Sequence, residues 1–207
     1  MSFLKLLSGQ RRLVASREEP DQSGQLCPTG LLLAQFEDAV QSGVDFIQVR
    51  ERDLEAGQLA GLVEAALAVA RGTTSRIVVN DRLDVALGCG ADGVHLRADS
   101  ILPADARRIV PTGFLIGRSV HTPGEASAAE GCDYLIAGTV FPSRSKAAGA
   151  AVLGIEGLRA IVRVSRAPVL AIGGVTADRF DDVAAAGAAG VAGIGLFLPI
   201  DSLRPAP

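Results

Sequence analysis

Eight short segments rich in valine, isoleucine and leucine recur along almost the whole chain, and several end in polar or glycine-rich residues. Continuous apolar runs of this length indicate strands buried on both faces, as in a parallel sheet covered by helices. The eight segments are Arg12–Arg17, Asp45–Glu51, Arg76–Asp81, Gly93–Arg97, Phe114–His121, Tyr134–Phe141, Pro168–Gly174 and Gly190–Phe197.

The stretches between these segments carry helical or short connecting patterns. Helical spacing of apolar residues is found in Leu31–Ser42, Leu54–Arg71 and Ile155–Ser165, and shorter stretches in Pro103–Val110, Pro123–Glu130 and Thr176–Ala186. Pro103 and Pro123 suit the first turn of a helix. Together these features predict an α/β fold, a single (β/α)8 TIM barrel formed by residues 1–207.

The end of the chain departs from a regular barrel. After the eighth segment only Leu198–Pro207 remain, and they include three prolines, so we expect a truncated or missing last outer helix. The apolar barrel wall left there predicts self-association into a homo-oligomer, or cover by the N-terminal Phe3–Leu7 stretch.

The composition and charge of the chain argue against some classes of function. Hydrophobic residues make up 48% of the chain and charged residues 21%, as in soluble globular proteins. A formal net charge of −3 argues against a nucleic-acid partner. No apolar run approaches the roughly 18 residues of a membrane span, and no signal peptide is evident. We therefore expect a cytoplasmic protein with neither a nucleic-acid nor a membrane partner.

The second segment ends in polar residues that alternate. Period-two alternation sends Gln48, Arg50 and Arg52 to the same side, where two guanidiniums and an amide can clamp an anion. A barrel rim with Glu51 and Asp53 as salt-bridge partners would be the commoner outcome for such a pattern alone. Alternation inside a barrel favours the clamp.

The third and fourth segments bring carboxylates to the same rim. Asn80 and Asp81 suit a hard cation beside a phosphate, and Asp99 can supply a second carboxylate. The alternative is that Asn80 or Asp81 caps the following helix, and this is the reading favoured by the short motif alone.

The chain has two histidines, His95 and His121. His121 falls where the fifth segment reaches the rim, and imidazole suits proton transfer near neutral pH. A structural and a functional role are both open for it. His95 comes earlier in its segment, and we expect it to be structural.

The last three segments end in loops suited to phosphate. Phe141–Lys146 combines hydroxyls and cations, which fits either a lid over a phosphate or a solvated loop. Ile172–Gly174 and Gly193–Gly195 occupy the positions of the usual phosphate cradle of such barrels, where bare glycine amides bond the oxygens. They predict a phosphorylated ligand, a property shared by many barrel enzymes.

Five motifs in order, QVRER, VNDRLDVALGCGADGVHL, IGRSVHTPGEA, CDYLIAGTVFPSRSK and AIGGVTADR, resemble the thiamine phosphate synthase and thiazole tautomerase superfamily. The resemblance covers nearly the whole chain and agrees with a barrel fold. In the synthases it implies that a pyrimidine methyl diphosphate ionises, pyrophosphate leaves, and a thiazole phosphate nitrogen captures the cation.

The resemblance assigns a role to each motif residue. Catalytic roles fall on Arg50, Arg52, Ser119, His121 and Lys146, diphosphate contacts on Gln48, Asn80, Ser143 and Ser145, the thiazole-phosphate cradle on Gly173, Gly174, Ile194 and Gly195, and Mg2+ binding on Asp81 and Asp99. Arg52 replaces the lysine that is usual in the family, which keeps the charge and alters its geometry.

Three departures from the family pattern weaken the assignment to the synthase. The family's G-Q-x-D motif reads Arg97–Ser100 here, so the second magnesium carboxylate is either shifted to Asp99 or lost. Gly195 replaces a serine. The sequence around Arg50–Arg52 and Gly117–His121 is more similar to that of the tautomerases. In those enzymes the histidine matching His121 shuttles a proton.

The retained residues favour the synthase. Asp81 and the Ser143–Lys146 loop are kept, and a metal ligand with a diphosphate lid would serve no purpose in tautomerisation. We therefore expect a Mg2+-dependent transferase whose partners are a phosphorylated pyrimidine and a phosphorylated thiazole. The alternatives are a metal-free thiazole tautomerase and a non-catalytic regulator that binds a thiamine precursor.

Overall fold

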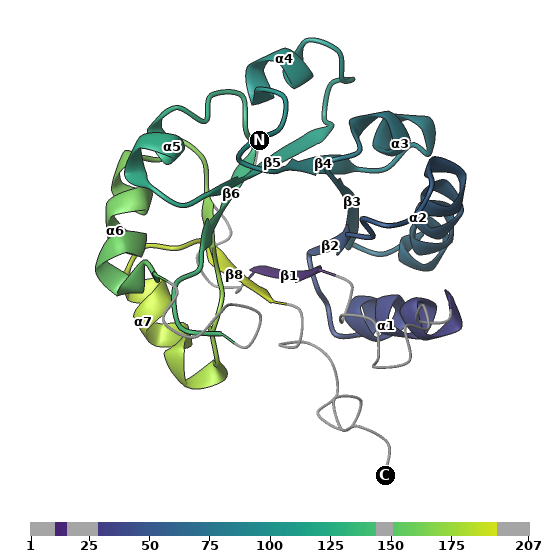
Figure 1. Ribbon diagram of the computed structural model, residues 1–207. Coiled ribbons are helices and arrows are strands. Elements are labelled where there is room, and N and C mark those ends of the chain that lie inside the picture. The colour runs from purple at the N-terminus through teal and green to yellow at the C-terminus, as the bar shows by residue number, and fades with distance from the viewer. Residues whose placement is uncertain (1–10, 16–28, 144–150, 194–207) are drawn as a thin grey trace.

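A closed parallel sheet forms the centre of the molecule in the computed structural model, which describes residues 11–15, 29–143 and 151–193. Neighbouring strands pair in chain order, and the pairing of β8 with β1 closes the sheet (Figure 1). The strands are β1 (Arg11–Ala15), β2 (Phe46–Val49), β3 (Arg76–Asn80), β4 (Gly93–Leu96), β5 (Leu115–Val120), β6 (Tyr134–Gly138), β7 (Val169–Ile172) and β8 (Gly190–Gly193). Each lies within its predicted segment, except that β1 begins one residue earlier.

Helices surround this sheet, giving an α/β fold of the TIM-barrel type (Figure 1). They are α1 (Thr29–Gln41), α2 (Ala56–Ala70), α3 (Leu83–Gly88), α4 (Pro103–Arg107), α5 (Pro123–Ser127), α6 (Gly154–Val164), the 3-10 turn η2 (Ala177–Arg179) and α7 (Phe180–Ala185). Pro103 and Pro123 open α4 and α5, as predicted. The predicted end of the barrel after residue 193 and the Phe3–Leu7 stretch lie outside the described residues.

The capping interpretation of Asn80 and Asp81 is wrong. The residue that caps α3 is Arg82, and it forms no side-chain capping hydrogen bond. Asp81 instead has a φ of 63°, in the left-handed region that aspartate tolerates better than most side chains. Its carboxylate accepts a hydrogen bond from Ser100 in the loop after β4. The backbone turn thus directs Asp81 towards a neighbouring strand end and away from α3.

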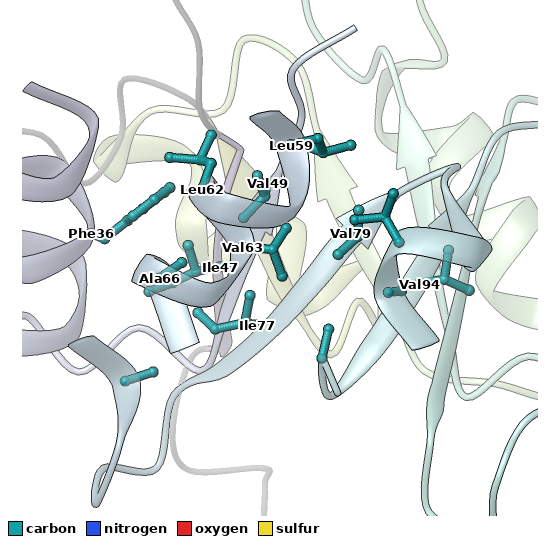
Figure 2. Close-up of a cluster of buried hydrophobic side chains, with 14 of the residues drawn as sticks. Phe36, Ile47, Val49, Leu59, Leu62, Val63, Ala66, Ile77, Val79 and Val94 are labelled. Carbon is teal, nitrogen blue, oxygen red and sulfur yellow. The ribbon is translucent and has the colours of Figure 1, made fainter. Parts of the chain in front are cut away.

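The outer core lies between the sheet and its helices. Because strand residues alternate, Ile47 and Val49 of β2 face outward, and so do Ile77 and Val79 of β3. Figure 2 shows these side chains meeting the inner face of α2, which presents Leu59, Leu62, Val63 and Ala66. All of these side chains are buried, and burial of each large one contributes roughly 1.5–3 kcal/mol. Among the described residues, no helix is long and apolar enough to cross a membrane.

The inward-facing positions fill the barrel with a second, smaller core. Phe46, Val78, Tyr134 and Leu170 pack together there. Tyr134 stacks between Phe46 and His95, with ring centroids 5.4 Å and 5.6 Å apart. At the next inward level β2, β3, β4 and β5 present polar side chains, namely Gln48, Asn80, His95 and Ser119, whereas β6 and β7 present Ile136 and Ile172. The apolar layer therefore forms the floor of a polar site at the carboxyl ends of the strands.

Gly117 makes room for Tyr134, and its replacement by alanine should destabilise the fold. A Cβ at this position would lie 2.1 Å from the Tyr134 Cζ, and the buried ring has no solvent to move into. We expect Gly117→Ala to lower the free energy of unfolding by about 1–3 kcal/mol, measured by denaturant titration. The control is Gly61→Ala on the exposed face of α2, where no atom lies within 4 Å of the new Cβ, and a gain of up to about 1 kcal/mol is expected. Equal stability of the two variants would contradict this packing argument.

Candidate active site

A cavity of about 370 Å³ lies above the polar layer. Its walls come from strand ends and from the loops that follow them. Nine of the residues predicted from the sequence line it, namely Gln48, Arg50, Arg52, Asn80, Asp99, Ser119, His121, Ser143 and Gly173. Asp81 and Gly174 lie next to the cavity without lining it. Ser145, Lys146, Ile194 and Gly195 lie outside the described residues.

Positive charge gathers on one side of this cavity. Arg50 and Arg52 follow β2, and Arg97 follows β4. Burial lowers the pKa of Arg50, and the charges of Arg52 and Arg97 lower it further. Each of these effects opposes the cationic form of Arg50, so an anion in the cavity would relieve both the desolvation and the repulsion. The site is therefore suited to an anion of high charge.

The side-chain amides of Gln48 and Asn80 lie next to these arginines at the bottom of the cavity. The Gln48 side chain is 4% exposed, and its Nε2 donates a 2.9 Å hydrogen bond to the Asn80 Oδ1. This bond fixes the orientation of both amides, because Gln48 must present its nitrogen to Asn80. The Asn80 Nδ2 and the Gln48 Oε1 are thereby oriented as well. The pair gives the pocket polar groups of defined direction beside the arginines.

His95 connects the barrel interior to the cavity. Its Nε2 lies 2.9 Å from the Ser119 Oγ and its Nδ1 lies 3.3 Å from the Tyr134 hydroxyl. Burial, followed by the charge of Arg50, lowers the pKa of His95 to about 3, so the ring is neutral near pH 7. Burial also raises the pKa of Tyr134. A protonated Tyr134 can donate to Nδ1, which leaves Nε2 to donate to Ser119 and the Ser119 proton available to a ligand. His95 was predicted to be structural, and the structure adds that it lines the cavity.

His121 occupies the rim of the cavity and is exposed. Its backbone N–H donates a 2.6 Å hydrogen bond to the Glu125 Oε2, and its Nδ1 lies 3.3 Å from the same oxygen. Glu125 belongs to the first turn of α5, where its N–H donates to the capping Thr122 Oγ1 at 3.2 Å. The helix start therefore orients His121. Glu125 was not identified from the sequence, although its place four residues after His121 is the relevant signal.

The two predicted magnesium carboxylates, Asp81 and Asp99, both face Arg97. The Arg97 Nε donates a 2.9 Å hydrogen bond to the Asp99 Oδ1, and Nη2 donates to Oδ2. The Arg97 Nη1 lies 3.7 Å from the Asp81 Oδ2. In the described part of the chain, no three histidine, cysteine, aspartate or glutamate side chains are grouped so that they could hold a metal ion. The carboxylates are thus in salt bridges with a cation of the chain itself.

Glycines after β7 let two loops approach each other closely. Gly173 lines the cavity, and a Cβ there would lie 2.5 Å from the Thr139 Cγ2. Gly174 has a φ of +61°, and its Cβ would lie 2.3 Å from the Pro142 carbonyl oxygen. Arg179 covers this junction, since its guanidinium lies 4.2 Å from the centre of the Phe141 ring. The Gly-Gly turn therefore positions the loop after β6, in addition to any contact with a ligand.

Arg97, Thr139 and Ile136 line the cavity but were not predicted as site residues, and Ile172, which also lines it, was named only as the start of the predicted phosphate cradle. Alternation along the fourth strand could have identified Arg97, because it lies two residues after His95. Thr139 follows β6 in an otherwise apolar context and gave no signal.

Fold and cavity together define an α/β barrel with a cationic site at the carboxyl ends of its strands. The family model described as thiamine monophosphate synthase matches residues 22–197. The thiamine-phosphate synthase of Methanoculleus marisnigri is 43% identical over 156 residues, covering 74% of each chain. That of Anaeromyxobacter dehalogenans is 43% identical over 159 residues, covering 76% of this chain and 71% of the relative.

The solved structures agree with the sequence comparison. Thiamine phosphate pyrophosphorylase from Pyrococcus furiosus superposes with a TM-score of 0.76 at 32% identity, covering 92% of this chain and 88% of that one. A 3-hexulose-6-phosphate synthase, at 18% identity and a TM-score of 0.64, shares the fold. The chain belongs to the thiamine monophosphate synthase family, and the resemblance found in its motifs is confirmed.

The neutral, buried His95 should make the protein less stable in mild acid. Its folded pKa of about 3 lies below the unfolded value near 6.5, so the unfolded chain binds the extra proton between these values. This contribution to stability is complete above about pH 6.5 and decreases as the pH falls, by roughly 1.4 kcal/mol per pH unit. We expect His95→Asn to remove that slope between about pH 6 and 4.5, measured by urea unfolding at each pH. Ser119→Ala keeps the imidazole buried and should keep the slope. A slope that His95→Asn leaves intact would contradict the assignment.

Proposed function

We propose that the protein is a thiamine-phosphate synthase, a transferase that joins a pyrimidine methyl diphosphate to a thiazole phosphate and releases pyrophosphate. The observation that carries the proposal is the meeting of Arg50 and Arg52 with Gln48 and Asn80 at one cavity. Membership in the family supports the choice of substrates. The cavity of about 370 Å³ is within the range of small-molecule sites.

The chemistry makes one main demand on such a site. The C–O bond between the pyrimidine methylene and the diphosphate breaks, and both electrons leave with pyrophosphate. The lone pair of the thiazole nitrogen then forms the new C–N bond, which leaves a thiazolium cation. Negative charge grows on the leaving group, so oriented cations and hydrogen-bond donors at that group accelerate the step. Arg50, Arg52 and the amide of Asn80 are the groups we assign to this task.

The remaining assignments follow the cavity walls. Ser119 is assigned as a donor to the diphosphate, since His95 fixes its oxygen from below. The loop after β6 is assigned to the same anion through Ser143, Ser145 and Lys146. The thiazole phosphate is assigned to Gly173, Gly174, Ile194 and Gly195, which follow β7 and β8. His121 at the rim would shape the thiazole end of the pocket.

The proposal extends to the whole chain. We propose one domain formed by residues 1–207, a (β/α)8 barrel with a truncated or missing last outer helix and self-association over the uncovered wall. A cytoplasmic location fits the function, because multiply charged phosphorylated substrates do not cross a bilayer unaided.

Mg2+ was predicted at Asp81 and Asp99, and the arrangement of these residues does not fit a resident ion. Arg97 pairs with both carboxylates, and Ser100 donates to the Asp81 Oδ1. A divalent cation prefers carboxylate and carbonyl oxygens that are not already neutralised by a guanidinium. No step of the proposed reaction is therefore routed through a metal.

A second candidate, thiazole tautomerase, is favoured by one contact. The Glu125 carboxylate lies beside the His121 Nδ1 at the cavity rim, which is the arrangement that orients a histidine for proton transfer. A tautomerase would need this pair and would make no use of the diphosphate groups. The two enzymes can be separated with single variants.

Arg50 should carry a large part of the synthase rate. We expect Arg50→Ala to lower pyrophosphate release by about 30- to 1,000-fold, because it removes roughly 2–4 kcal/mol of transition-state stabilisation. The assay supplies both phosphorylated substrates and measures pyrophosphate and thiamine phosphate. Arg166→Ala, which removes an exposed charge paired with Glu130, should have no effect. Absence of pyrophosphate release by the parent chain, with and without Mg2+, would rule out the synthase.

His121 distinguishes the synthase from the tautomerase. If proton transfer is the chemistry, His121→Asn should lower turnover of the thiazole carboxylate phosphate by about 10²–10⁴-fold. For a synthase, ionisation does not need the imidazole, so we expect pyrophosphate release to change less than about tenfold. Both reactions are measured for both proteins. A loss of pyrophosphate release as large as that of Arg50→Ala would contradict our assignment of His121.

A further inference from the structure

The loop after β4 differs from the family motif in charge as well as in residue identity. The motif G-Q-x-D places a glycine where this chain has Arg97 and an aspartate where it has Ser100. The substitutions add one positive charge and remove one negative charge next to Asp81. Asp99, at the variable position of the motif, carries a negative charge of its own, so residues 97–100 are neutral overall where the specified residues of the motif carry one negative charge. The loop is therefore less negative by one unit, which favours an anionic ligand.

Arg97 is held in place from several directions. Asp99 binds its guanidinium through two nitrogens, and Asp81 lies on the other side at 3.7 Å. Its backbone N–H donates a 3.1 Å hydrogen bond to the Ser100 hydroxyl, which in turn donates to Asp81. Paired hydrogen bonds fix both the position and the plane of a guanidinium.

Arg118 holds the backbone of the same loop. Its Nη2 donates a 2.7 Å hydrogen bond to the Ala98 carbonyl, and its Nη1 donates at 3.3 Å to that of Ile101. The loop that carries Arg97 is thus anchored to β5. An arginine held this way loses less conformational freedom on binding a ligand than a free one would.

Arg97 lines the same cavity as the residues assigned to the diphosphate. It lines the pocket with Arg50 and Arg52, and its charge is among the causes that lower the pKa of Arg50. Three guanidiniums at one cavity wall repel one another, and the carboxylates of Asp81, Asp99 and Glu51 offset part of this repulsion. At Arg50 the charges of Arg52 and Arg97 each lower the pKa more than Glu51 raises it. A ligand with several negative charges would balance the cluster.

From these contacts we propose that Arg97 is a diphosphate-binding residue that supplies, from the chain itself, the positive charge for which a magnesium ion was predicted at Asp81 and Asp99. The two carboxylates are then positioning residues for the guanidinium. The inference deepens the proposed synthase function and rests on it. Its consequence is that the diphosphate binds without a divalent cation.

Inorganic pyrophosphate is a suitable probe, because its binding needs no turnover. In isothermal titration with EDTA present, the wild-type protein should bind pyrophosphate. Arg97→Gln should weaken that binding roughly 10- to 100-fold, the size expected for a charge-assisted hydrogen bond. Arg97→Lys keeps the charge and should restore part of the affinity. Arg166→Gln, a control for the loss of one exposed positive charge, should leave the affinity unchanged.

A reciprocal variant tests the metal directly. Arg97→Gly combined with Ser100→Asp places glycine and aspartate where the family motif has them. We expect this protein to lose pyrophosphate affinity in EDTA and to bind Mn2+, followed by its electron spin resonance signal, at least about tenfold more tightly than wild type.

The outcomes distinguish a failure of the role proposed for Arg97 from a failure of the proposed synthase function. If wild type binds pyrophosphate only with Mg2+, or if Arg97→Gln leaves the affinity in EDTA unchanged, the role of Arg97 is wrong while the synthase stands. If wild type binds no pyrophosphate in either condition, both are wrong. Circular dichroism of each variant verifies that a loss of binding reflects the site and not the fold.

Discussion

Strict alternation along the strands of a closed parallel sheet is the constraint on which the rest of this structure depends. Each strand sends every second side chain into the barrel, so the interior is filled in layers. Phe46, Tyr134 and Leu170 fill the lower layer with apolar volume. The next inward positions are polar on β2 to β5 and apolar at Ile136 and Ile172, and this mixed layer opens onto a cavity. The floor and the site are therefore products of one periodicity.

The position of the site also decides its electrostatics. The apolar floor excludes water from below. For this reason His95 stays neutral, and burial lowers the pKa of Arg50. A cation in such surroundings interacts with an anion more strongly than it would on an open surface. The same desolvation makes the cluster of guanidiniums unfavourable by itself, and Asp81 and Asp99 offset part of that cost through Arg97. In the proposed function, the diphosphate completes the compensation.

The sequence predicted the strands and the inward row of β2 because both depend on a local period. It identified Gln48, Arg50 and Arg52 without any knowledge of the neighbouring strands. It could not predict contacts that depend on backbone geometry and on pairing between loops. Asp81 was predicted to bind Mg2+, with a helix cap as the alternative favoured by the short motif alone, because the sequence does not reveal a φ of 63° or the hydrogen bond from Ser100. Arg97 was treated as a departure from a motif, since nothing in the sequence shows that it stands between two carboxylates.

The contrast between Arg97 and the predicted magnesium ion shows how one electrostatic task can be met in two ways. A bound ion neutralises a diphosphate strongly, but it has to be recruited from solution and held by carboxylates that repel one another when it is absent. A tethered guanidinium brings a smaller charge, yet it is present before the substrate arrives and already oriented by its partners. With Arg50 and Arg52 at the same wall, the smaller charge of each group is offset by their number. In the role proposed for Arg97, the loop after β4, anchored through Arg118, is the part of the barrel in which this chain adjusts how it binds an anion.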